Sequence, residues 1–376
     1  KGSSVSICAD GSYMVAGSYL GVLLYNFDDS MGDWVMVYDF TDQLITNGFG
    51  YYRAVIADDC NTVAIGAPNN REKGYDAGGI QVFSKDDQIW SLVGKAIFGN
   101  RKDDLFGYSL DLSEAGEKLI VGATGAGYVE IYEYQSRINV YDKVNELTGN
   151  TEGDDSFGYS VAISGEGDRA VVGAPLADGD DQIVLNGYVR VVDIVNFSFV
   201  QQFEGKKEEA SLGYAVDISQ DGSTIAFSST ENGHVIVFKF NDVTFEWEKV
   251  GVSMTIEDEH FGASLSLSRD GTQVAAGAPL NNFYEPLAGA AYVFEYDDDE
   301  WLPMGDAIYG RSTFDECGSA IAFSSDNYTL VFACPGHDDG GNDSGQVCTY
   351  SNEALIPTSI IRKLLDRLCS FLNVTI

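Results

Sequence analysis

The chain has 376 residues, of which 58 are acidic and 22 basic, so its formal net charge is −36. Such a surface repels nucleic acid and anionic membranes. It favours cations, polyamines, basic partners or high-salt surroundings. Alternatively, the acidic residues serve only to keep the protein soluble. No stretch of about eighteen apolar residues occurs, so we expect no membrane-spanning helix. The 42 Gly, 21 Tyr and 21 Phe are typical of an all-β protein with many turns.

One β-hairpin pattern recurs along the chain. We call it a frame, because one short motif opens it and another closes it. In residues 106–124, Phe106-Gly107 opens an alternating stretch, a turn follows at Ala115-Gly116, and Gly122-Ala123-Thr124 closes a second stretch. Five further frames run from Phe49-Gly50 to Gly66-Ala67-Pro68, Phe157-Gly158 to Gly173-Ala174-Pro175, Leu212-Gly213 to Ser228-Ser229-Thr230, Phe261-Gly262 to Gly277-Ala278-Pro279, and Cys317-Gly318 to Ala333-Cys334-Pro335. A first copy, marked by Asp10-Gly11 and Gly17-Ser18, has no Phe-Gly. Seven copies at a period of about 50 residues predict one repeat architecture.

Each copy has the pattern of four strands. In the third copy these are Tyr108–Leu112, Lys118–Gly122, Tyr128–Tyr132 and a strand near Val140–Leu147. Four short strands per repeat predict an all-β fold, a seven-bladed β-propeller of four-stranded antiparallel blades, over residues 1–350. We name the strands of a blade A to D. The Phe-Gly motifs should form the seams, Gly-Ala-Pro should end strand B, and the Trp residues that open strand D (Trp34, Trp90, Trp247 and Trp301) should pack between neighbouring blades.

The tail, residues 351–376, departs from the repeat. Its apolar residues recur at helical spacing after Pro357-Thr358-Ser359, at Ile360, Ile361, Leu364, Leu365, Leu368, Phe371 and Leu372. This pattern predicts a C-terminal amphipathic helix with Arg362, Lys363 and Arg367 as a basic patch. The helix could pack on the acidic rim of the propeller or contact a partner or membrane surface, and an irregular last strand is the other alternative.

The six cysteines suggest disulfides. Cys8 and Cys60 occupy matching places in the first two copies, so a Cys8–Cys60 bond is expected between neighbouring blades. Cys334 and Cys348 lie at facing ends of one hairpin and form our second expected pair. The rival arrangement joins Cys317 to Cys334 and Cys348 to Cys369, and six unrelated buried thiols are a third possibility. An even count with sensible pairs favours an oxidising compartment.

Four sequons agree with secretion and mark glycosylation candidates at Asn196, Asn327, Asn342 and Asn373. The sequence begins at Lys1 without Met or a signal peptide, which suggests a processed chain.

The repeats resemble the FG-GAP family, the seven-bladed propellers of integrin α subunits and related surface proteins. The matching residues are Phe106-Gly107-Tyr108-Ser109, Phe157-Gly158-Tyr159-Ser160 and the Gly-Ala-Pro triplets at 66–68, 173–175 and 277–279. The resemblance covers residues 1–350. It implies extracellular recognition or adhesion, with ligands on the face formed by the B–C and D–A loops.

One departure from that family concerns calcium. Integrin-like blades that bind Ca²⁺ carry an Asp-rich loop between strands A and B, whereas here the links are tight turns such as Asp221-Gly222 and Asp270-Gly271. A two-residue turn cannot supply the six to eight oxygens that Ca²⁺ needs, so we expect no integrin-type calcium sites.

The long B–C loops of copies 2, 4, 6 and 7 are the candidate binding sites, because loops on a rigid scaffold carry most binding residues. The ligand-binding candidates are Asn69, Asn70, Arg71, Tyr75, Asp76, Asp178, Asp180, Asp181, Asn281, Asn282, Phe283, Tyr284 and Glu285. The loop of copy 7 has the densest oxygen ligands, so Asp338, Asp339, Asn342 and Asp343 are a candidate Ca²⁺ site. No other cofactor is expected.

Catalytic motifs are missing from the sequence. His234, His260 and His337 lie in different copies, and neither a nucleophile elbow nor a phosphate loop occurs. We therefore expect a recognition or adhesion propeller, not an enzyme, that binds a protein or glycan through its B–C loop face. A glycan-acting enzyme with two carboxylates in the central channel, and an acidic matrix or mineral-associated scaffold, are the alternatives.

Overall fold

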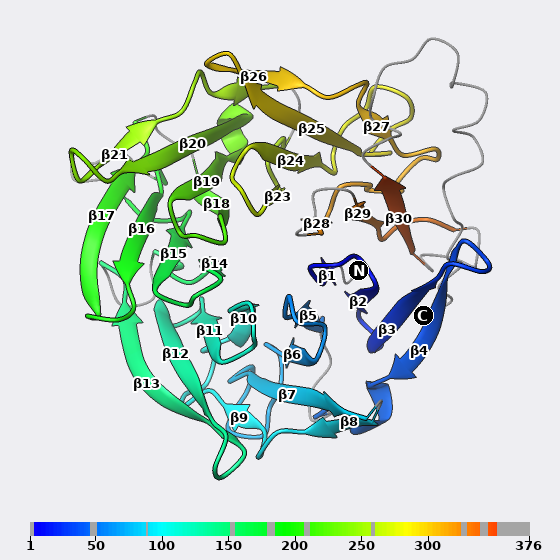
Figure 1. Ribbon diagram of the computed structural model, residues 1–376, viewed down its shortest axis with the longest axis vertical. Helices are drawn as coiled ribbons and strands as arrows, with labels where there is room; N and C mark the ends of the chain where they lie inside the picture. The colour runs from blue at the N-terminus through cyan, green and yellow to red at the C-terminus, as the bar shows by residue number, and fades with distance from the viewer. Residues whose placement is uncertain are drawn as a thin grey trace.

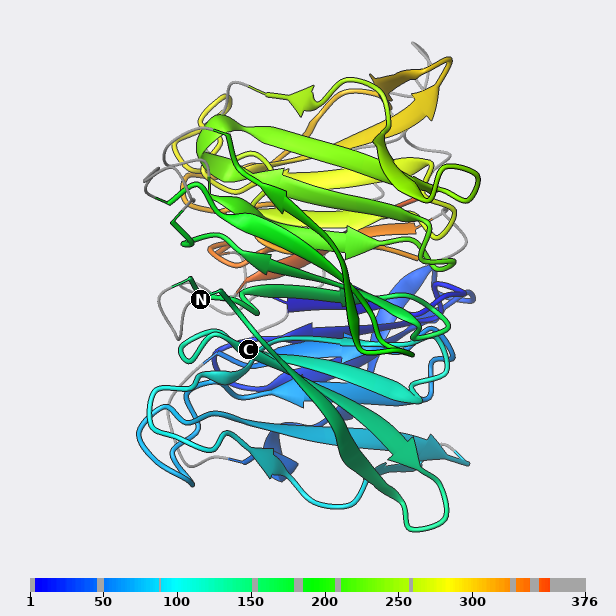
Figure 2. The ribbon, with the colours of Figure 1, turned by 90° about the vertical axis from the view of Figure 1, so that its left-hand side faces the viewer.

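Figure 1 shows the computed structural model, in which seven β-sheets surround a central axis, and Figure 2 shows the same ring turned by 90°. The structure describes residues 4–45, 51–87, 89–150, 155–178, 185–206, 211–256, 260–324, 329–338 and 345–351. Consecutive strands pair antiparallel within each sheet, with the first strand nearest the axis and the last at the rim (Figure 1). The predicted seven-bladed β-propeller is therefore confirmed.

The first four blades contain the following strands. Blade 1 consists of β1 (Ser4–Ile7), β2 (Tyr13–Gly17), β3 (Val22–Asp28) and β4 (Asp33–Asp39). Blade 2 consists of β5 (Arg53–Ile56), β6 (Thr62–Gly66), β7 (Gly79–Asp86) and β8 (Ile89–Leu92), with β9 (Ile97–Phe98) also paired to β7. Blade 3 consists of β10 (Phe106–Leu112), β11 (Lys118–Ala123), β12 (Tyr128–Gln135) and β13 (Val140–Thr148). Blade 4 consists of β14 (Ser160–Ile163), β15 (Arg169–Ala174), β16 (Tyr188–Asp193) and β17 (Ser198–Glu204).

The remaining blades follow the same order. Blade 5 consists of β18 (Leu212–Ile218), β19 (Thr224–Ser229), β20 (His234–Asn241) and β21 (Glu246–Lys249), with β22 (Met254–Thr255) paired to β20. Blade 6 consists of β23 (Ser264–Leu267), β24 (Gln273–Ala278), β25 (Ala290–Asp297) and β26 (Glu300–Pro303), with β27 (Ile308–Tyr309) paired to β25. Within the described residues, blade 7 has β28 (Ile321–Phe323), β29 (Thr329–Cys334) and β30 (Gln346–Ser351).

Helical structure is sparse. The described residues contain two 3-10 helices, η1 (Thr41–Gln43) and η2 (Thr230–Asn232). Nowhere in these ranges is there a helix with the length and apolar character to cross a membrane. The predicted C-terminal amphipathic helix falls on residues 352–376, outside the described part of the chain.

The A–B links of blades 1 to 6, the ones that the structure describes in full, are short turns. The carboxylates of Asp221 and Asp270 each accept the backbone N–H two residues further on, at 2.9 Å and 3.0 Å. The glycine that follows each aspartate has a positive φ, +68° at Gly222 and +72° at Gly271. Residues with a Cβ rarely adopt this backbone conformation. These turns leave no room in the loop for a calcium-binding set of ligands.

The same turns tie the blades to one another through their backbones. The backbone N–H of Asp59 donates to Glu114, that of Glu114 to Gly165, that of Gly165 to Gln220, and that of Gln220 to Arg269, at N···O distances of 3.0, 3.0, 2.8 and 3.0 Å. Each bond joins a turn to the turn of the next blade. The A–B turns therefore form a continuous belt around one end of the central axis from blade 2 to blade 6.

Glycines of neighbouring blades meet at four of the described seams: Gly66 with Gly107, Gly122 with Gly158, Gly173 with Gly213, and Gly277 with Gly318. Between blades 5 and 6, Gly262 meets Ser228 instead, and between blades 1 and 2, Gly17 meets Tyr52. A Cβ added to Gly122 would lie 2.1 Å from the carbonyl oxygen of Gly158, and one added to Gly173 would lie 2.1 Å from that of Gly213. Phe157, which precedes Gly158, is fully buried between blades 3 and 4. The glycines thus permit a backbone approach that any side chain would prevent, while the phenylalanine fills the adjacent core.

The serine of Phe-Gly-x-Ser adds a hydrogen bond to this seam. The hydroxyls of Ser109, Ser160 and Ser264 donate to the carbonyl oxygens of Gly158, Gly213 and Gly318 in the next blade, at 2.6, 2.9 and 2.7 Å. A half-buried carbonyl at the contact is thereby satisfied. The repeated serine is thus part of the seam between blades.

Seven apolar clusters fill the spaces between adjacent blades. In one of them, Leu24 and Phe40 of the first blade pack with Ile65, Phe83 and Trp90 of the second. The predicted inter-blade role of the Trp residues is confirmed at Trp90.

The ring closes where blade 7 meets blade 1. Trp34 and Met14 share a buried cluster with Val331 and Ala333 of β29. The indole N–H of Trp34 donates to the Thr349 hydroxyl at 3.4 Å. Apolar packing between two separate sheets therefore closes the ring, and β1 stays paired to β2 in its own blade.

Two disulfides are present, and one of our two expected pairs is wrong. Cys8 bonds Cys60 as expected, which links the A–B turns of blades 1 and 2. Cys334, however, bonds Cys317 and not Cys348. The register of the other blades explains this pairing, because the first residue of the Phe-Gly motif faces the second residue of Gly-Ala across the hairpin, as Phe106 faces Ala123.

We predict that Gly122→Ala destabilises the protein by about 3 kcal/mol or more, because the new methyl group would collide with a backbone carbonyl that cannot move independently. Thermal unfolding followed by circular dichroism measures the effect. Gly32→Ala is the matched control: nothing lies within 4 Å of its Cβ, and only its φ of +66° makes the change unfavourable. Equal losses in the two variants would show that the seam tolerates a side chain.

Candidate functional site

The four long B–C loops share one backbone anchor. In each loop a glycine just before strand C donates its N–H to the carbonyl oxygen of a residue near the loop start. The pairs are Gly78 with Asn70, Gly187 with Ala177, Gly289 with Asn281, and Gly345 with His337, at 3.0, 3.0, 3.2 and 2.9 Å. All four glycines have positive φ. Each loop is therefore closed at its base, and in blades 2 and 6, where the loop is described throughout, this bond helps to hold the segment between the two residues in place.

The B–C loop of blade 2 presents an arginine stacked on an exposed tyrosine. The Arg71 guanidinium carbon lies 4.1 Å from the centre of the Tyr75 ring, and Arg71 also pairs with Asp76 at 3.3 Å. Tyr75 is 53 % exposed. Its carbonyl accepts the N–H of Asp103 from the following D–A link at 2.8 Å, so the loop rests on its neighbour. This arrangement brings three predicted binding residues together on the surface.

The B–C loop of blade 6 presents aromatic rings. Phe283 is 74 % and Tyr284 67 % exposed, and both rings lie 5.1 Å, centre to centre, from Tyr309 at the end of β27. Glu285 follows them and is also exposed. Aromatic rings that pack on one another while remaining exposed are unusual on the surface of a soluble protein and are typical of a binding site.

Two predicted binding residues hold the loops in shape. Asn70 and Asn281 are each 3 % exposed. Their side-chain oxygens accept the backbone N–H of Glu72 and of Phe283, both at 2.9 Å. They occupy the same place in the two repeats and fix the turn from within, so the exposed residues after them are the ones that can meet a ligand.

The other candidates are divided between described and undescribed residues. Asn69 is half-buried, and Asn282 is exposed with its oxygen accepting the Leu287 N–H at 2.9 Å. Asp178 accepts the Leu185 N–H at 3.1 Å, and Asp338 is exposed. Outside the described residues lie Asp180, Asp181, Asp339, Asn342 and Asp343. The calcium site of blade 7 therefore stays a prediction.

Sequence reasoning overlooked an aspartate two residues before several Phe-Gly motifs. Asp104, Asp155 and Asp315 are buried at 1, 1 and 2 % exposure. Asp104 accepts the N–H groups of Asn100 and Arg101 at 2.9 and 2.8 Å, and Asp315 does the same for Arg311 and Ser312. These carboxylates organise the D–A links. The recurrence of Asp at a fixed offset from Phe-Gly was the signal that could have found them.

The central channel carries a row of tyrosines toward its D–A end. A cavity of about 390 Å³ is lined by inner strands of the blades and includes Arg53, Tyr108, Tyr159 and Tyr214. Neighbouring tyrosine rings lie 5.2 and 5.0 Å apart, and the Arg53 guanidinium lies 5.4 Å from the Tyr108 ring centre. Burial and the two flanking tyrosines raise the pKa of Tyr159, so this hydroxyl keeps its proton at physiological pH.

Toward the A–B end the lining of the channel includes several acidic residues. A smaller cavity of about 170 Å³ is lined by Asp58, Asp111 and Asp217, among others. Glu114 and Arg269, from blades 3 and 6, form an ion pair at 2.8 Å. Both side chains are about as exposed as typical surface residues, so this pair adds little stability, although it joins two blades that are not neighbours.

The two channel aspartates act as ties between inner strands. Asp111 accepts the N–H of Ile163 in the next blade and of its own neighbour Leu112, both at 2.9 Å. Asp217 likewise accepts the N–H of Leu267, at 2.6 Å. Burial raises the pKa of Asp111 to about 8 and that of Asp217 to about 6, against the effect of the backbone hydrogen bonds. These contacts favour a structural role over catalysis.

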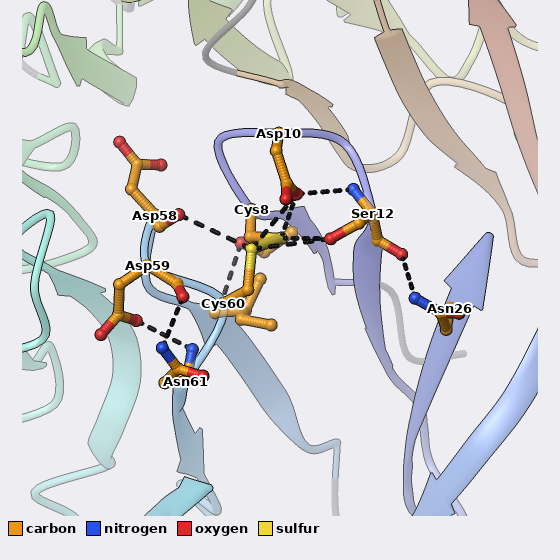
Figure 3. The surroundings of a disulfide bond; sticks show 10 residues. Cys8, Asp10, Ser12, Asn26, Asp58, Asp59, Cys60 and Asn61 are labelled. Carbon is orange, nitrogen blue, oxygen red and sulfur yellow. Dashed lines mark hydrogen bonds between the residues drawn. A yellow bond between two sulfur atoms is a disulfide. The ribbon is translucent and has the colours of Figure 1, made fainter. Parts of the chain in front are cut away.

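One group of potential metal ligands surrounds the first disulfide (Figure 3). An Asp10 carboxylate oxygen lies 3.4 Å from the sulfur of Cys8 and 3.3 Å from that of Cys60. Because the two sulfurs are bonded to each other, they are not thiolates and do not bind a metal ion in this state. Asp10 instead accepts the Ser12 N–H at 2.8 Å and shapes the turn.

These features define a rigid propeller scaffold whose variable B–C loops project from one face. Residues 145–188 match the model of the FG-GAP repeat, and this match and the seven blades together support an FG-GAP seven-bladed propeller.

Comparison with known proteins adds the fold and nothing more specific. No curated protein matches the sequence. A solved structure of Kuenenia stuttgartiensis hydrazine synthase is similar, with a TM-score of 0.60 and 13 % sequence identity, covering 95 % of each chain. At this level of identity the likeness establishes a shared fold.

We predict that the channel carboxylates make the protein less stable as pH rises from about 4 to about 8. Over this range the unfolded Asp111, with its ordinary pKa of 3.8, loses its proton while the folded form keeps it up to about pH 8, so the unfolded state is favoured. Melting temperatures across this range should show a steeper fall for the wild type than for Asp111→Asn, which has no charge to gain. The exposed Glu300→Gln is the control, and parallel curves for all three proteins would contradict the prediction.

Proposed function

We propose that this chain is an extracellular or cell-surface recognition propeller that binds a protein or a glycan through its B–C loop face, without catalysis. The observation that carries the proposal is that the described loops of blades 2 and 6 expose large side chains while buried amides fix their shape. Preformed loops lose little entropy on binding, which is what a recognition surface requires. The FG-GAP repeat and the two disulfides support an extracellular location.

The enzyme alternative is less well supported. Two carboxylates do face the channel, and their environments raise their pKa values to different extents, as in an acid–base pair. Each of them, however, already accepts two backbone N–H groups, at Asp111 from Leu112 and Ile163. A catalytic carboxylate needs an oxygen available to substrate.

The scaffold alternative rests on the net charge of −36 alone. Binding that depends on overall charge weakens as salt shortens the screening length from about 10 Å at 0.1 M to about 3 Å at 1 M. Binding through fitted loops depends much less on salt. The tail stays part of the proposal, as a C-terminal amphipathic helix that packs on the acidic rim or contacts a partner.

The loop-face variant carries three substitutions, Arg71→Ala, Tyr75→Ala and Tyr284→Ala. We predict that it binds the ligand of the wild-type protein at least tenfold more weakly than the wild type does. The screen uses printed arrays of oligosaccharides and of purified extracellular-matrix proteins, and each hit is then titrated at 0.1 M and 1 M salt. All three side chains are exposed, so their loss should leave the fold intact.

The control variant removes exposed apolar groups from the opposite face, Val243→Ser with Phe245→Ser in the C–D hairpin of blade 5. It should bind as the wild type does. If the loop-face variant binds as well as this control, the loop face is not the binding surface.

Asn196 is placed for glycosylation. It lies exposed in the turn between β16 and β17, where its N–H and its amide contact Asp193 at 2.8 and 2.9 Å. We predict that a eukaryotic secretory host attaches a glycan there, seen by mass spectrometry of the peptide and lost in Asn196→Gln. An unmodified Asn196 in secreted protein would count against this site. The other sequons, Asn327, Asn342 and Asn373, lie outside the described residues.

A further inference from the structure

Three aromatic rings form a surface cluster on blade 6, here called the blade 6 platform: Phe283, Tyr284 and Tyr309. Phe283 stacks on Tyr309 with an interplanar angle of 21°, and Tyr284 completes the triangle at 5.6 Å from Phe283. The first two rings remain largely exposed, at 74 % and 67 %. Apolar surface of this kind costs free energy in water unless something covers it.

The platform is held open by its supports. Asn281 is buried, accepts the Phe283 N–H and donates to the Tyr292 hydroxyl at 3.3 Å. On the other side, the Phe314 N–H of the following D–A link donates to the Pro286 carbonyl at 2.9 Å. The loop is thus pinned at both ends, and its rings cannot fold into the core. The site exists before any ligand arrives.

Polar residues adjoin the rings along the loop. Asn282 is exposed next to Phe283; its side-chain oxygen accepts the Leu287 N–H at 2.9 Å, so its amide N–H groups are the ones to meet a ligand. The Glu285 carboxylate accepts the Thr313 hydroxyl at 3.5 Å, a long bond that a ligand hydroxyl can replace. An amide, a carboxylate and a hydroxyl beside flat rings match a sugar, which has an apolar C–H face and a rim of hydroxyls. The equivalent loop of blade 2 has Arg71 stacked on its tyrosine and offers no such free ring pair.

Charge and size distinguish the possible occupants. The net charge of −36 and the adjacent Glu285 disfavour an anionic glycan. A protein partner normally covers about 800 Å² on each side, far more than two or three rings supply. A single sugar unit has the size of one or two rings, so a neutral saccharide fits best.

We propose that the blade 6 platform binds a neutral saccharide unit, whose C–H face stacks on Tyr284 and Phe283 while Asn282 and Glu285 bond its hydroxyls. This inference rests on the proposed function and names the ligand class of one loop.

The test uses the full chain and a panel of neutral tetrasaccharides, derived from β-glucan, mannan, galactan and xylan, with oligogalacturonate as the acidic comparison. Saturation-transfer NMR finds the binder and calorimetry measures its affinity. We expect binding of at least one neutral member, a loss of tenfold or more in Tyr284→Ala and in Phe283→Ala, and near wild-type affinity in Tyr284→Phe, which keeps the ring.

The outcomes separate this inference from the proposed function. If no neutral saccharide binds, or if Tyr284→Ala binds as the wild type does, the platform is not a saccharide site. A ligand lost in Arg71→Ala with Tyr75→Ala but kept in Tyr284→Ala would overturn the platform and leave loop-face recognition standing. A protein ligand that depends on the platform rings would replace the saccharide with a peptide as occupant. Binding unaffected by both sets of variants would overturn both ideas.

Discussion

The close approach of two glycines, found at four of the described seams, is the constraint on which the rest of the molecule depends. Gly122 and Gly158 bring the backbones of blades 3 and 4 so near that the next blade's carbonyl occupies the space of a Cβ. The Ser109 hydroxyl satisfies that same carbonyl, and Phe157 fills the core beside it. Backbone proximity, a hydrogen bond and apolar burial therefore act at one point, and the repeat of these residues sets the angle from blade to blade.

Because of this seam, the A–B end and the B–C end of the blades have different roles. At the A–B end the turns bond to one another through their backbones, and Cys8–Cys60 adds a covalent link. Turns that join their neighbours cannot also form long ligand-binding loops, which is why the calcium loops of integrin-like blades have no counterpart at the described turns. At the other end the B–C loops of blades 2 and 6 are anchored at their bases and by the following D–A links, so the side chains between these anchors can vary without disturbing the ring.

Much of this architecture was predictable from the sequence, because Phe-Gly and Gly-Ala-Pro recur at a constant offset and each residue in them has one physical task. The second disulfide was predicted only as part of the rival arrangement, and the preferred Cys334–Cys348 pair was wrong. Cys317 and Cys334 stand where Phe106 and Ala123 face each other, whereas β29 and β30 pair Cys348 with Phe332. Position in the repeat therefore identifies the bond better than the ends of the hairpin do.

The sequence pattern did not predict which side chains of the candidate site are buried and which are exposed. Loop length and polarity predicted a binding surface but did not show that Asn281 is buried whereas Asn282 is exposed. The side-chain oxygens of both accept a backbone N–H of the loop. The two differ only in the direction of their side chains, and that direction depends on backbone angles that one sequence does not specify. Nor did Tyr309 stand out, since it lies in a short strand well after the loop it supports. A binding surface assembled from a loop and the strand packed beneath it becomes visible only when the fold brings them together, and for this protein that assembly, more than any motif, indicates what its ligand should be.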